Sequence, residues 1–267
     1  MRSEKIAILY ICTGRYSIFW EKFYQSAQQY LFPNYRKHFF VFTDDSAIVS
    51  NDHITSIFKK TRGFPDDSLY RYLYFLEIEH LLAPFDYVYF FNANISFLGV
   101  IQEEFLPSSD SSFELVAVKH AGYISKHPIF YPYERSPQSM AHLPYQKDLS
   151  FGYYWGGING GCTKAYLKLC KTLCQWIDSD KANGVLAVFH DESHFNKYIN
   201  LFGGKIVPSI YGWPENWPTQ DEIKILIRDK VILHKSFKKQ TTNPILRITN
   251  MTKRLVSGLR WRFGYNF

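Results

Sequence analysis

The sequence lacks several features that identify large classes of protein. It has no uninterrupted apolar run of about 18 residues, so we expect no membrane-spanning helix. Its N-terminus lacks the apolar region and cleavage site of a signal peptide. None of its 4 cysteines forms a C-x-x-C pair. We therefore expect a cytoplasmic location and reduced thiols at Cys12, Cys162, Cys170 and Cys174.

Acidic residues are absent from the C-terminal part of the chain. No Asp or Glu follows Asp229, and the chain carries eight Lys and Arg residues from Lys235 onward. Because the net charge is +7, the rest of the protein is close to neutral. Nucleic acid is not an expected partner, since no recognition motif accompanies the charge.

Apolar residues in the same tail recur at helical spacing, namely Ile248, Met251, Leu255 and Leu259. Such a helix would lie on an anionic membrane surface, which for a cytoplasmic protein is the inner face of the cytoplasmic membrane. The alternative is a helix packed on the protein with its basic face in water. Both interpretations fit the pattern.

Strand-like and helix-like segments alternate along the remaining chain. Hydrophobic residues make up 46% of the sequence and aromatic residues 18%, which excludes wholesale disorder. The expected strands are residues 5–11, 38–43, 54–58, 87–91 and 115–118. The expected helices are residues 17–30, 66–82, 163–177 and 190–198. This alternation predicts an α/β fold with a mainly parallel central sheet flanked by helices.

Two amides follow the most apolar of the expected strands. Tyr87 to Phe91 is a continuous aromatic and β-branched run, typical of a strand covered on both faces, and Asn92-Ala93-Asn94 comes next. Ligands gather at the carboxyl ends of such strands, and nucleotide-sugar enzymes often carry an Asp-x-Asp there that binds a divalent metal. An amide brings no negative charge. The sequence therefore predicts a nucleotide-sugar site without its usual metal.

Three further segments are candidates for chemistry. Thr13 and Tyr16, in the loop after the first strand, are suited to a nucleotide base, although that loop has no GxGxxG. The run Gly156-Gly-Ile-Asn-Gly-Gly161 indicates either close backbone approach to a ligand or a tight turn under a helix. His190-Asp-Glu-Ser193 either holds a carboxylate beside a sugar's anomeric carbon or is a capped, acid-rich helix start.

Six segments, taken together, resemble one known family. They are LYICTGRY, FPDDSLYRYLYF, YFFNANISF, YPYERSPQSMAHLP, GYYWGGINGGCTKAY and FHDESHFNKY. Their order and approximate spacing are similar to those of the family 6 glycosyltransferases, over roughly residues 5–235. That family includes the blood-group A and B transferases, α1,3-galactosyltransferase, and bacterial members that carry Asn-x-Asn and work without a metal.

The resemblance implies a GT-A type fold for the catalytic domain, which we expect to be residues 1–240. Residues 241–267, which the resemblance does not cover, are expected to be a basic amphipathic tail. Glycine at the position of Gly157 goes with UDP-N-acetylgalactosamine in the family, because a β-methyl would occupy space that an acetamido group needs. Trp155 is larger than the residues familiar at its position, which bears on the same choice. The implied donor-binding residues are Ile11, Thr13, Tyr16, Arg71, Asn92, Ala93, Asn94, Gly156, Gly157 and Asp191.

The resemblance assigns the acceptor side in the same way. Glu192 matches the catalytic glutamate beneath the reacting anomeric carbon, and His120 matches a histidine that hydrogen-bonds the acceptor galactose. The implied acceptor-binding residues are His120, Trp155, Trp213, Glu215 and Glu192. Pro132 stands where the family has a threonine that contacts the acceptor, so one contact is lost or replaced.

The function implied is a retaining, metal-independent α1,3-N-acetylgalactosaminyltransferase. It would move GalNAc from UDP-GalNAc to a β-galactoside, which is often α1,2-fucosylated in this family. No cofactor is expected, so protein cations must meet the negative charge of the leaving UDP, and the candidates are Arg228, Lys230 and Lys235. The alternatives are an α1,3-galactosyltransferase that uses UDP-Gal and a catalytically silent glycan-binding module.

Overall fold

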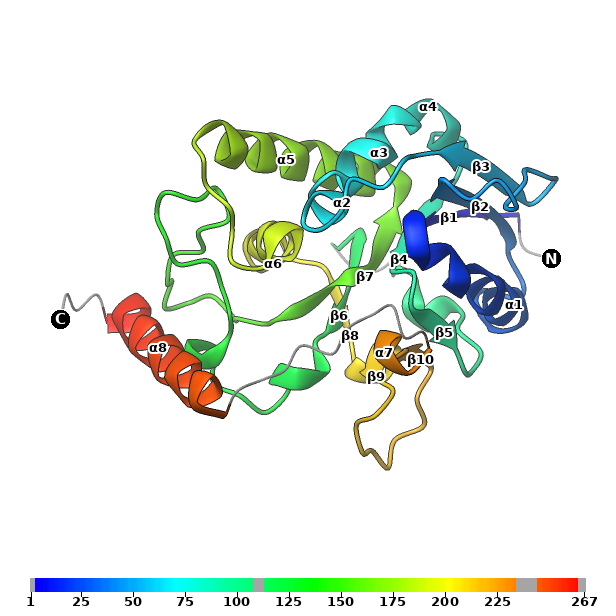
Figure 1. Cartoon of the computed structure of the whole chain (residues 1–267). Helices are drawn as coiled ribbons and strands as arrows, with labels where there is room; N and C mark the ends of the chain where they lie inside the picture. The colour runs from blue at the N-terminus through cyan, green and yellow to red at the C-terminus, as the bar shows by residue number, and fades with distance from the viewer. Residues whose placement is uncertain (1–2, 108–112, 234–243, 264–267) are drawn as a thin grey trace.

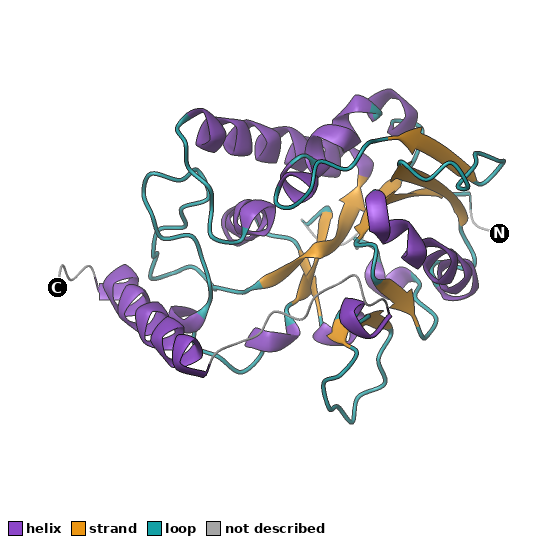
Figure 2. Cartoon of the chain, in the orientation of Figure 1, coloured by secondary structure: helices purple, strands orange, loops and turns teal. Residues whose placement is uncertain are grey.

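The computed structural model describes residues 3–107, 113–233 and 244–263 (Figure 1). Within them a 7-stranded sheet has the order β3-β2-β1-β4-β7-β6-β8, and helices lie on both of its sides (Figure 2). Its strands are β1 Lys5–Ile11, β2 Arg36–Thr43, β3 Ile54–Phe58, β4 Tyr87–Phe91, β6 Leu115–Lys119, β7 Tyr154–Cys162 and β8 Lys205–Val207. A 3-stranded sheet has the order β5-β10-β9, with β5 Ile95–Phe97, β9 Trp213–Pro214 and β10 Ile225–Ile227.

The large sheet is mainly parallel, as the sequence predicts. Strands β1 to β4 run in one direction, and β6 and β8 share it, while β7 is antiparallel to its neighbours β4 and β6. The α-helices are α1 Trp20–Tyr30, α2 Asp66–Leu69, α3 Arg71–Glu77, α4 Glu79–Leu82, α5 Thr163–Ala182, α6 His190–Phe202, α7 Lys230–Leu233 and α8 Pro244–Phe263. Short 3₁₀ turns are η1 Gly14–Phe19, η2 Glu103–Phe105, η3 Ala121–Tyr123, η4 Pro128–Phe130 and η5 Ser209–Tyr211.

Buried side chains alternate between the two faces of the sheet. In β1, Ile6, Ile8 and Tyr10 pack with α1 and the small sheet on one face. Ala7 and Leu9 pack on the opposite face with residues of α3, α5 and α6. Because both faces are covered, each central strand has apolar residues at every position, which explains the continuous apolar run of β4.

The segment with two Gly-Gly pairs is a strand, which the sequence did not predict. Neither reading of this run, a ligand-binding loop or a tight turn, anticipates β7, which lies between β4 and β6. A Cβ on Gly160 would overlap the ring of Tyr89 and lie 2.6 Å from the carbonyl oxygen of Val88. Close approach by the neighbouring strand therefore requires glycine here, and the low strand propensity of glycine conceals the strand.

The helices differ from expectation at their ends. The helix expected over residues 66–82 is divided into α2, α3 and α4, with breaks at Tyr70 and Ile78. Helix α5 continues beyond the expected residue 177 to Ala182, and α6 continues beyond residue 198 to Phe202. The breaks keep apolar residues of all three short helices in the core, namely Leu69, Tyr72, Phe75 and Leu82.

Helix α8 packs on the segment that contains η4, at the left of Figure 1. Gly258 lies so close to Ile129 that a Cβ would be 2.9 Å from the Ile129 carbonyl carbon. The Trp261 indole nitrogen donates a hydrogen bond of 2.6 Å to the Leu143 carbonyl oxygen. The indole packs against three aromatic rings, those of Tyr133, Tyr145 and Phe151.

This packing agrees with the second interpretation of the tail, that of a helix packed on the protein. Leu255 and Leu259 are partly buried, whereas the side chains of Ile248 and Met251 lie outside the described residues. Within the described part of the chain, no helix is long and apolar enough to cross a membrane. Association with a membrane surface stays a prediction, as does the cytoplasmic location. All four cysteines are free, as expected.

We expect Gly160→Ala to lower the free energy of unfolding by about 1–3 kcal/mol or more, because a methyl group must displace Tyr89 or the β4 backbone. Urea unfolding measures the change. The control is Gly204→Ala, where the nearest atom to a Cβ is 3.4 Å away, and we expect its effect to stay within about 0.5 kcal/mol. Equal effects of the two substitutions would contradict the steric explanation.

Candidate active site

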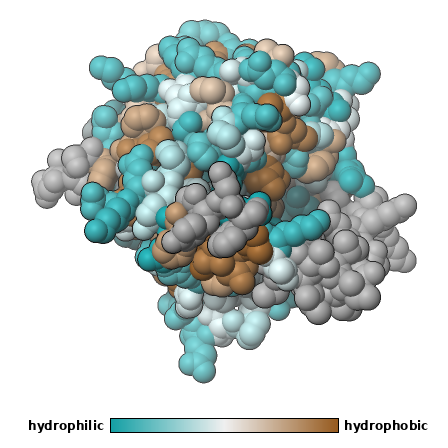
Figure 3. Space-filling model, turned by 90° about the vertical axis from the view of Figure 1, so that its left-hand side faces the viewer, coloured by the Kyte–Doolittle hydropathy of each residue, from teal (hydrophilic) through white to brown (hydrophobic). Residues whose placement is uncertain are grey.

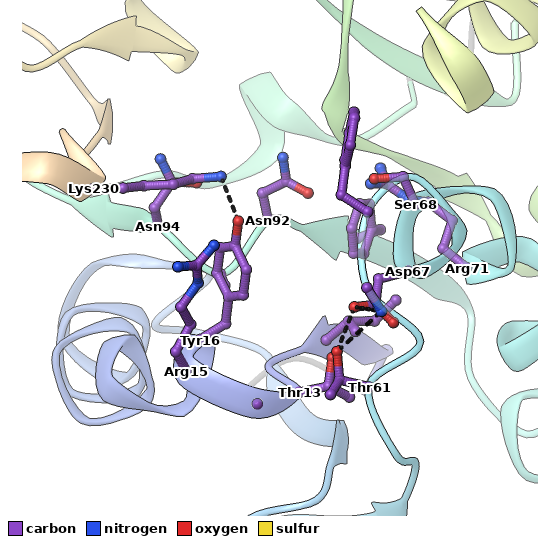
Figure 4. A pocket seen from close by; sticks show the side chains of 16 residues that line it. Thr13, Arg15, Tyr16, Thr61, Asp67, Ser68, Arg71, Asn92, Asn94 and Lys230 are labelled. Carbon is purple, nitrogen blue, oxygen red and sulfur yellow. Dashed lines mark hydrogen bonds between the residues drawn. The ribbon is translucent and has the colours of Figure 1, made fainter. Parts of the chain in front are cut away.

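A cavity of about 390 Å³ opens at the carboxyl ends of β1 and β4. This is the edge of a parallel sheet where ligands are expected. In Figure 4, Arg15, Tyr16 and Lys230 lie on one side of the cavity. Asp67 and Arg71 lie on the other side, and Asn92 lies between the two groups. The lining of the cavity also includes Ile11, Thr13, Phe64, Ala93 and Asn94. The structure thus brings most of the implied donor-binding residues together.

One wall of this cavity is cationic and aromatic. The Lys230 ammonium lies 4.8 Å from the centre of the Tyr16 ring and 3.4 Å from the Tyr16 hydroxyl. Arg15, in the turn η1, lines the same cavity and is exposed. An aromatic ring beside two cations suits a nucleoside base that carries phosphates. Arg15 was not among the candidate cations, although it stands in the loop that the sequence associates with a nucleotide.

Asn94 is fixed by the polypeptide backbone. Its side-chain nitrogen donates a hydrogen bond of 2.7 Å to the backbone carbonyl oxygen of Arg228. The backbone carbonyl oxygen of Asn94 accepts a hydrogen bond of 2.8 Å from the Arg228 N–H. An aspartate would place a carboxylate oxygen against the Arg228 carbonyl oxygen, where it has no proton to donate. The amide therefore suits the contact between the turn that follows β4 and the segment after β10.

Asn92 occupies the space beside Gly157. The Asn92 N–H donates a hydrogen bond of 2.8 Å to the Gly157 carbonyl oxygen. A Cβ on Gly157 would lie 2.6 Å from Cγ of Asn92. The space that glycine leaves on this side of β7 is thus filled by the asparagine amide. That an acetamido group needs the space left by Gly157 stays a prediction.

Glu192 lies in the first turn of α6, beside the start of β7. Its carboxylate accepts hydrogen bonds from the Tyr153 hydroxyl at 2.8 Å and from the Gly156 N–H at 2.9 Å. A Cβ on Gly156 would lie 2.9 Å from Cβ of Glu192, so glycine permits this approach. Burial raises the pKa of Glu192 to about 7, while the two hydrogen bonds oppose the rise. A carboxylate that is held in place and only partly solvated can stabilise positive charge nearby.

Asp191 is buried behind the cavity and faces Arg71. Their side chains are 3.1 Å apart, and each is almost fully buried. The Arg71 guanidinium also donates a hydrogen bond of 3.1 Å to the Gly156 carbonyl oxygen and lies over the Phe90 ring. Burial raises the pKa of Asp191, and Arg71 opposes that rise. Of this pair, Arg71 lines the cavity.

His120 and Trp155 form a stacked pair beside Glu192. Their ring centres are 3.5 Å apart, and the Trp155 indole donates a hydrogen bond of 2.9 Å to the Gly212 carbonyl oxygen. Nδ1 of His120 accepts a hydrogen bond of 3.0 Å from the Gly122 N–H, so the ring proton is on Nε2. Burial lowers the pKa of His120 to about 3, which keeps the ring neutral. Nε2–H is therefore a neutral hydrogen-bond donor.

The remaining predicted residues lie at varying distances from this centre. The Trp213 indole donates to the Trp217 carbonyl oxygen, and Trp217 lies 3.3 Å from where a Cβ on Gly122 would be. Glu215 instead pairs with Arg228, at 3.4 Å. Arg228 and Glu215 line a separate groove beside α1. Lys235 lies outside the described residues.

Two aromatic residues near Glu192 were not named as site residues. The Tyr153 hydroxyl donates a hydrogen bond to the Glu192 carboxylate. The Tyr123 ring packs edge-on against His120, with ring centres 5.0 Å apart, and lies tilted against Tyr153, with ring centres 4.8 Å apart. The aromatic pair before the glycine run was a signal for Tyr153. Tyr123 follows no recognisable motif, because its position depends on the η3 turn.

Within the described residues, no group of three His, Cys, Asp or Glu side chains is arranged to hold a metal ion. The carboxylate that lines the cavity, Asp67, accepts hydrogen bonds from the Arg62 and Gly63 N–H groups and from the Thr61 hydroxyl. It therefore holds the adjacent loop. The cavity offers cations and amides to an anionic ligand, which is the complement that a nucleoside diphosphate needs.

Comparisons with known proteins support this interpretation. The model of glycosyltransferase family 6 matches residues 2–239. The chain is 34% identical over 227 residues to the O-antigen biosynthesis glycosyltransferase WbnI of Escherichia coli, over 84% of this chain and 94% of that protein. It is 26% identical over 234 residues to globoside alpha-1,3-N-acetylgalactosaminyltransferase 1 of Gallus gallus. It is 27% identical over 234 residues to histo-blood group ABO system transferase 2 of Rattus norvegicus.

The two animal matches cover 83% and 82% of this chain but 65% and 67% of those proteins, so the chain spans about two thirds of their length. The bacterial match covers nearly the whole of its relative. The whole of helix α8 lies beyond the residues matched by the family model, which end at residue 239. The sheet, the donor-side cavity and the Glu192 centre all lie within the matched residues, and the chain is a glycosyltransferase that belongs to glycosyltransferase family 6.

Proposed function

We propose that this glycosyltransferase transfers N-acetylgalactosamine from UDP-GalNAc to a β-galactoside with an α1,3 linkage, with retention of configuration and without a metal ion. The observation that carries the proposal is the position of Glu192. Its carboxylate is held by Tyr153 and Gly156 between the Arg71 side of the donor cavity and the His120–Trp155 pair. A sugar bound at this junction would present its anomeric carbon to the carboxylate.

The donor side supports a uridine nucleotide. Tyr16 offers an aromatic face, and Lys230 and Arg15 offer positive charge where a diphosphate would extend from the base. As UDP leaves, negative charge builds up on the diphosphate, and preorganised cations stabilise it without a metal. Lys230 fits this role better than Arg228, because Arg228 is paired with Glu215 beside α1.

The acceptor side supports a galactoside. His120 presents a neutral N–H donor, and the stacked indole of Trp155 gives an apolar surface of the kind that packs on sugar rings. A fucose on the neighbouring hydroxyl remains part of the proposal through the family resemblance alone. The name of the avian relative, an alpha-1,3-N-acetylgalactosaminyltransferase, favours the same linkage and sugar.

A second donor, UDP-Gal, is favoured by one observation. The Asn92 amide fills the space beside Gly157, and it reduces the room that an acetamido group would need. The choice between UDP-GalNAc and UDP-Gal therefore depends on whether Asn92 moves when a donor binds.

We expect Glu192→Gln to lower kcat by about 10³-fold, because it removes the negative charge at the anomeric carbon.

Tyr153→Phe removes a hydrogen bond that favours ionised Glu192, so the pKa of Glu192 should rise above about 7. If ionised Glu192 is required, activity falls as the pH drops through this pKa, and Tyr153→Phe moves that limb to higher pH. UDP release with acceptor, measured against pH, tests this.

Tyr145→Phe is the control for Tyr153→Phe, since Tyr145 packs against Trp261, in the tail helix. Its pH profile should match that of the unmodified protein. Glu192→Gln with undiminished UDP release would contradict the catalytic role. Glycan binding without UDP release in the unmodified protein would favour the silent binding module.

We expect EDTA to leave activity intact and Lys230→Ala to lower kcat by about 10²-fold, with a smaller change in KM for the donor. The physical reason is that the charge on the diphosphate increases as the bond to the sugar breaks. The control is Lys22→Ala, which removes an exposed lysine of α1 and should leave kcat unchanged. Activity that depends strictly on Mn²⁺ would overturn metal independence.

A donor panel with Gly157→Ala separates the two explanations of Gly157. If the methyl group displaces Asn92, transfer from UDP-GalNAc and from UDP-Gal should fall together, by about tenfold or more. If glycine instead leaves room for the acetamido group, only UDP-GalNAc transfer should fall. Initial rates with each donor, measured with one galactoside acceptor and EDTA present, decide between them.

A further inference from the structure

Helix α8 brings a cation to the acceptor side of the active site, although it lies outside the part of the chain matched by the family model. The guanidinium of Arg254 lies 5.8 Å from the centre of the Phe189 ring. Burial raises the pKa of Tyr123, and the positive charge of Arg254 beside it opposes that rise. Phe189 is the residue before α6, three positions from Glu192. Residues about 60 or more positions apart in the sequence therefore meet beside the catalytic carboxylate.

Tyr123 connects Arg254 to that centre. Its ring lies 4.8 Å from Tyr153, whose hydroxyl holds Glu192, and 5.0 Å from His120. Tyr123 is close enough to Glu192 for the carboxylate charge to oppose its ionisation. A sugar attached to the acceptor residue at His120 would therefore extend along Tyr123 toward α8.

A second cation lies at the same tyrosine. The Lys126 ammonium is 4.9 Å from the centre of the Tyr123 ring. Arg254 and Lys126 are both exposed, and neither takes part in an ion pair among the described residues. Two exposed cations near one aromatic ring form a site of positive potential, which attracts an anionic group.

The helix that carries Arg254 is held in place by backbone contacts. The Arg135 guanidinium donates hydrogen bonds to the carbonyl oxygens of Arg254, Ile129 and Tyr131, at 3.1, 2.8 and 3.0 Å. About two turns further along the helix, the Trp261 indole donates a hydrogen bond to the Leu143 carbonyl oxygen. Figure 3, which views the molecule from this side, shows apolar patches among hydrophilic side chains.

We propose that Arg254, Lys126 and Tyr123 form an acceptor subsite for an oxyanion, a carboxylate or phosphate group on the glycan that receives the sugar. Guanidinium binds both groups through paired N–H donors, and the nearby ammonium adds charge. The proposal rests on the proposed function, since it assigns the acceptor to the His120 side. A neutral acceptor would use the same catalytic centre but leave this subsite unfilled.

The experiment compares three acceptors that share one terminal β-galactoside. One is neutral, one carries a carboxylate on the adjoining sugar, and one carries a phosphate there. The unmodified protein should use at least one anionic acceptor with a kcat/KM about tenfold above the neutral one. Added salt should reduce that preference, because the subsite is exposed. Whether the carboxylate or the phosphate is preferred identifies the source of the oxyanion.

Arg254→Ala should abolish the preference and leave kcat/KM for the neutral acceptor within about twofold. Arg254→Lys should keep part of it, and unfolding curves check that each variant folds. Lys253→Ala is the matched control, because it removes one exposed positive charge from the adjacent position of α8 and should keep the preference.

Equal use of the three acceptors by the unmodified protein would overturn the subsite. Loss of activity in Arg254→Ala toward all acceptors alike would also overturn it, and would assign Arg254 to the transfer step. Failure of the proposed function is distinct, because the neutral acceptor would then receive no sugar from either donor.

Discussion

The close approach of other elements to β7 is the constraint on which the active site depends. Four of its nine residues are glycine, and each is required by a different neighbour. Gly160 admits the Tyr89 ring, Gly157 admits the Asn92 amide, and Gly156 admits the first turn of α6. A side chain at any of these positions would push back the strand, the amide or the carboxylate. The same strand therefore joins β4 to β6 in the sheet and fixes the distance between the cavity and Glu192.

The cavity is lined by cations and neutral amides and not by a cluster of carboxylates. Asp191 is paired with buried Arg71, and the Asn94 side-chain amide donates a hydrogen bond to a backbone carbonyl oxygen, which would repel an aspartate. Positive charge is placed at the rim of the donor cavity, on Arg15 and Lys230. His120 stays neutral because it is desolvated, so the acceptor side offers a hydrogen-bond donor and no charge at its centre. Glu192 is then the carboxylate at the junction of the two sides.

The fold and the donor side could be predicted to a large extent from the sequence. Apolar runs identify β1, β2, β3, β4 and β6, because buried strands have continuous apolar faces. Thr13, Tyr16 and the Asn-x-Asn segment follow strand ends directly, so position along the chain places them at one sheet edge. Strand β7 was missed because its glycines have low strand propensity, and the contacts that demand glycine come from β4, β6 and α6.

By itself, the sequence determined the α/β class and the edge of the sheet where the cavity opens. These follow from local patterns, since strand periodicity needs no long-range information. The residues proposed for the catalytic centre came from the order of motifs that resembles the family. Only the tertiary structure decided that Asn92 fills the space beside Gly157, that Arg228 turns to Glu215, and that α8 carries Arg254 to Tyr123. Each of these depends on residues far apart in the chain, and their distances are set by packing between elements.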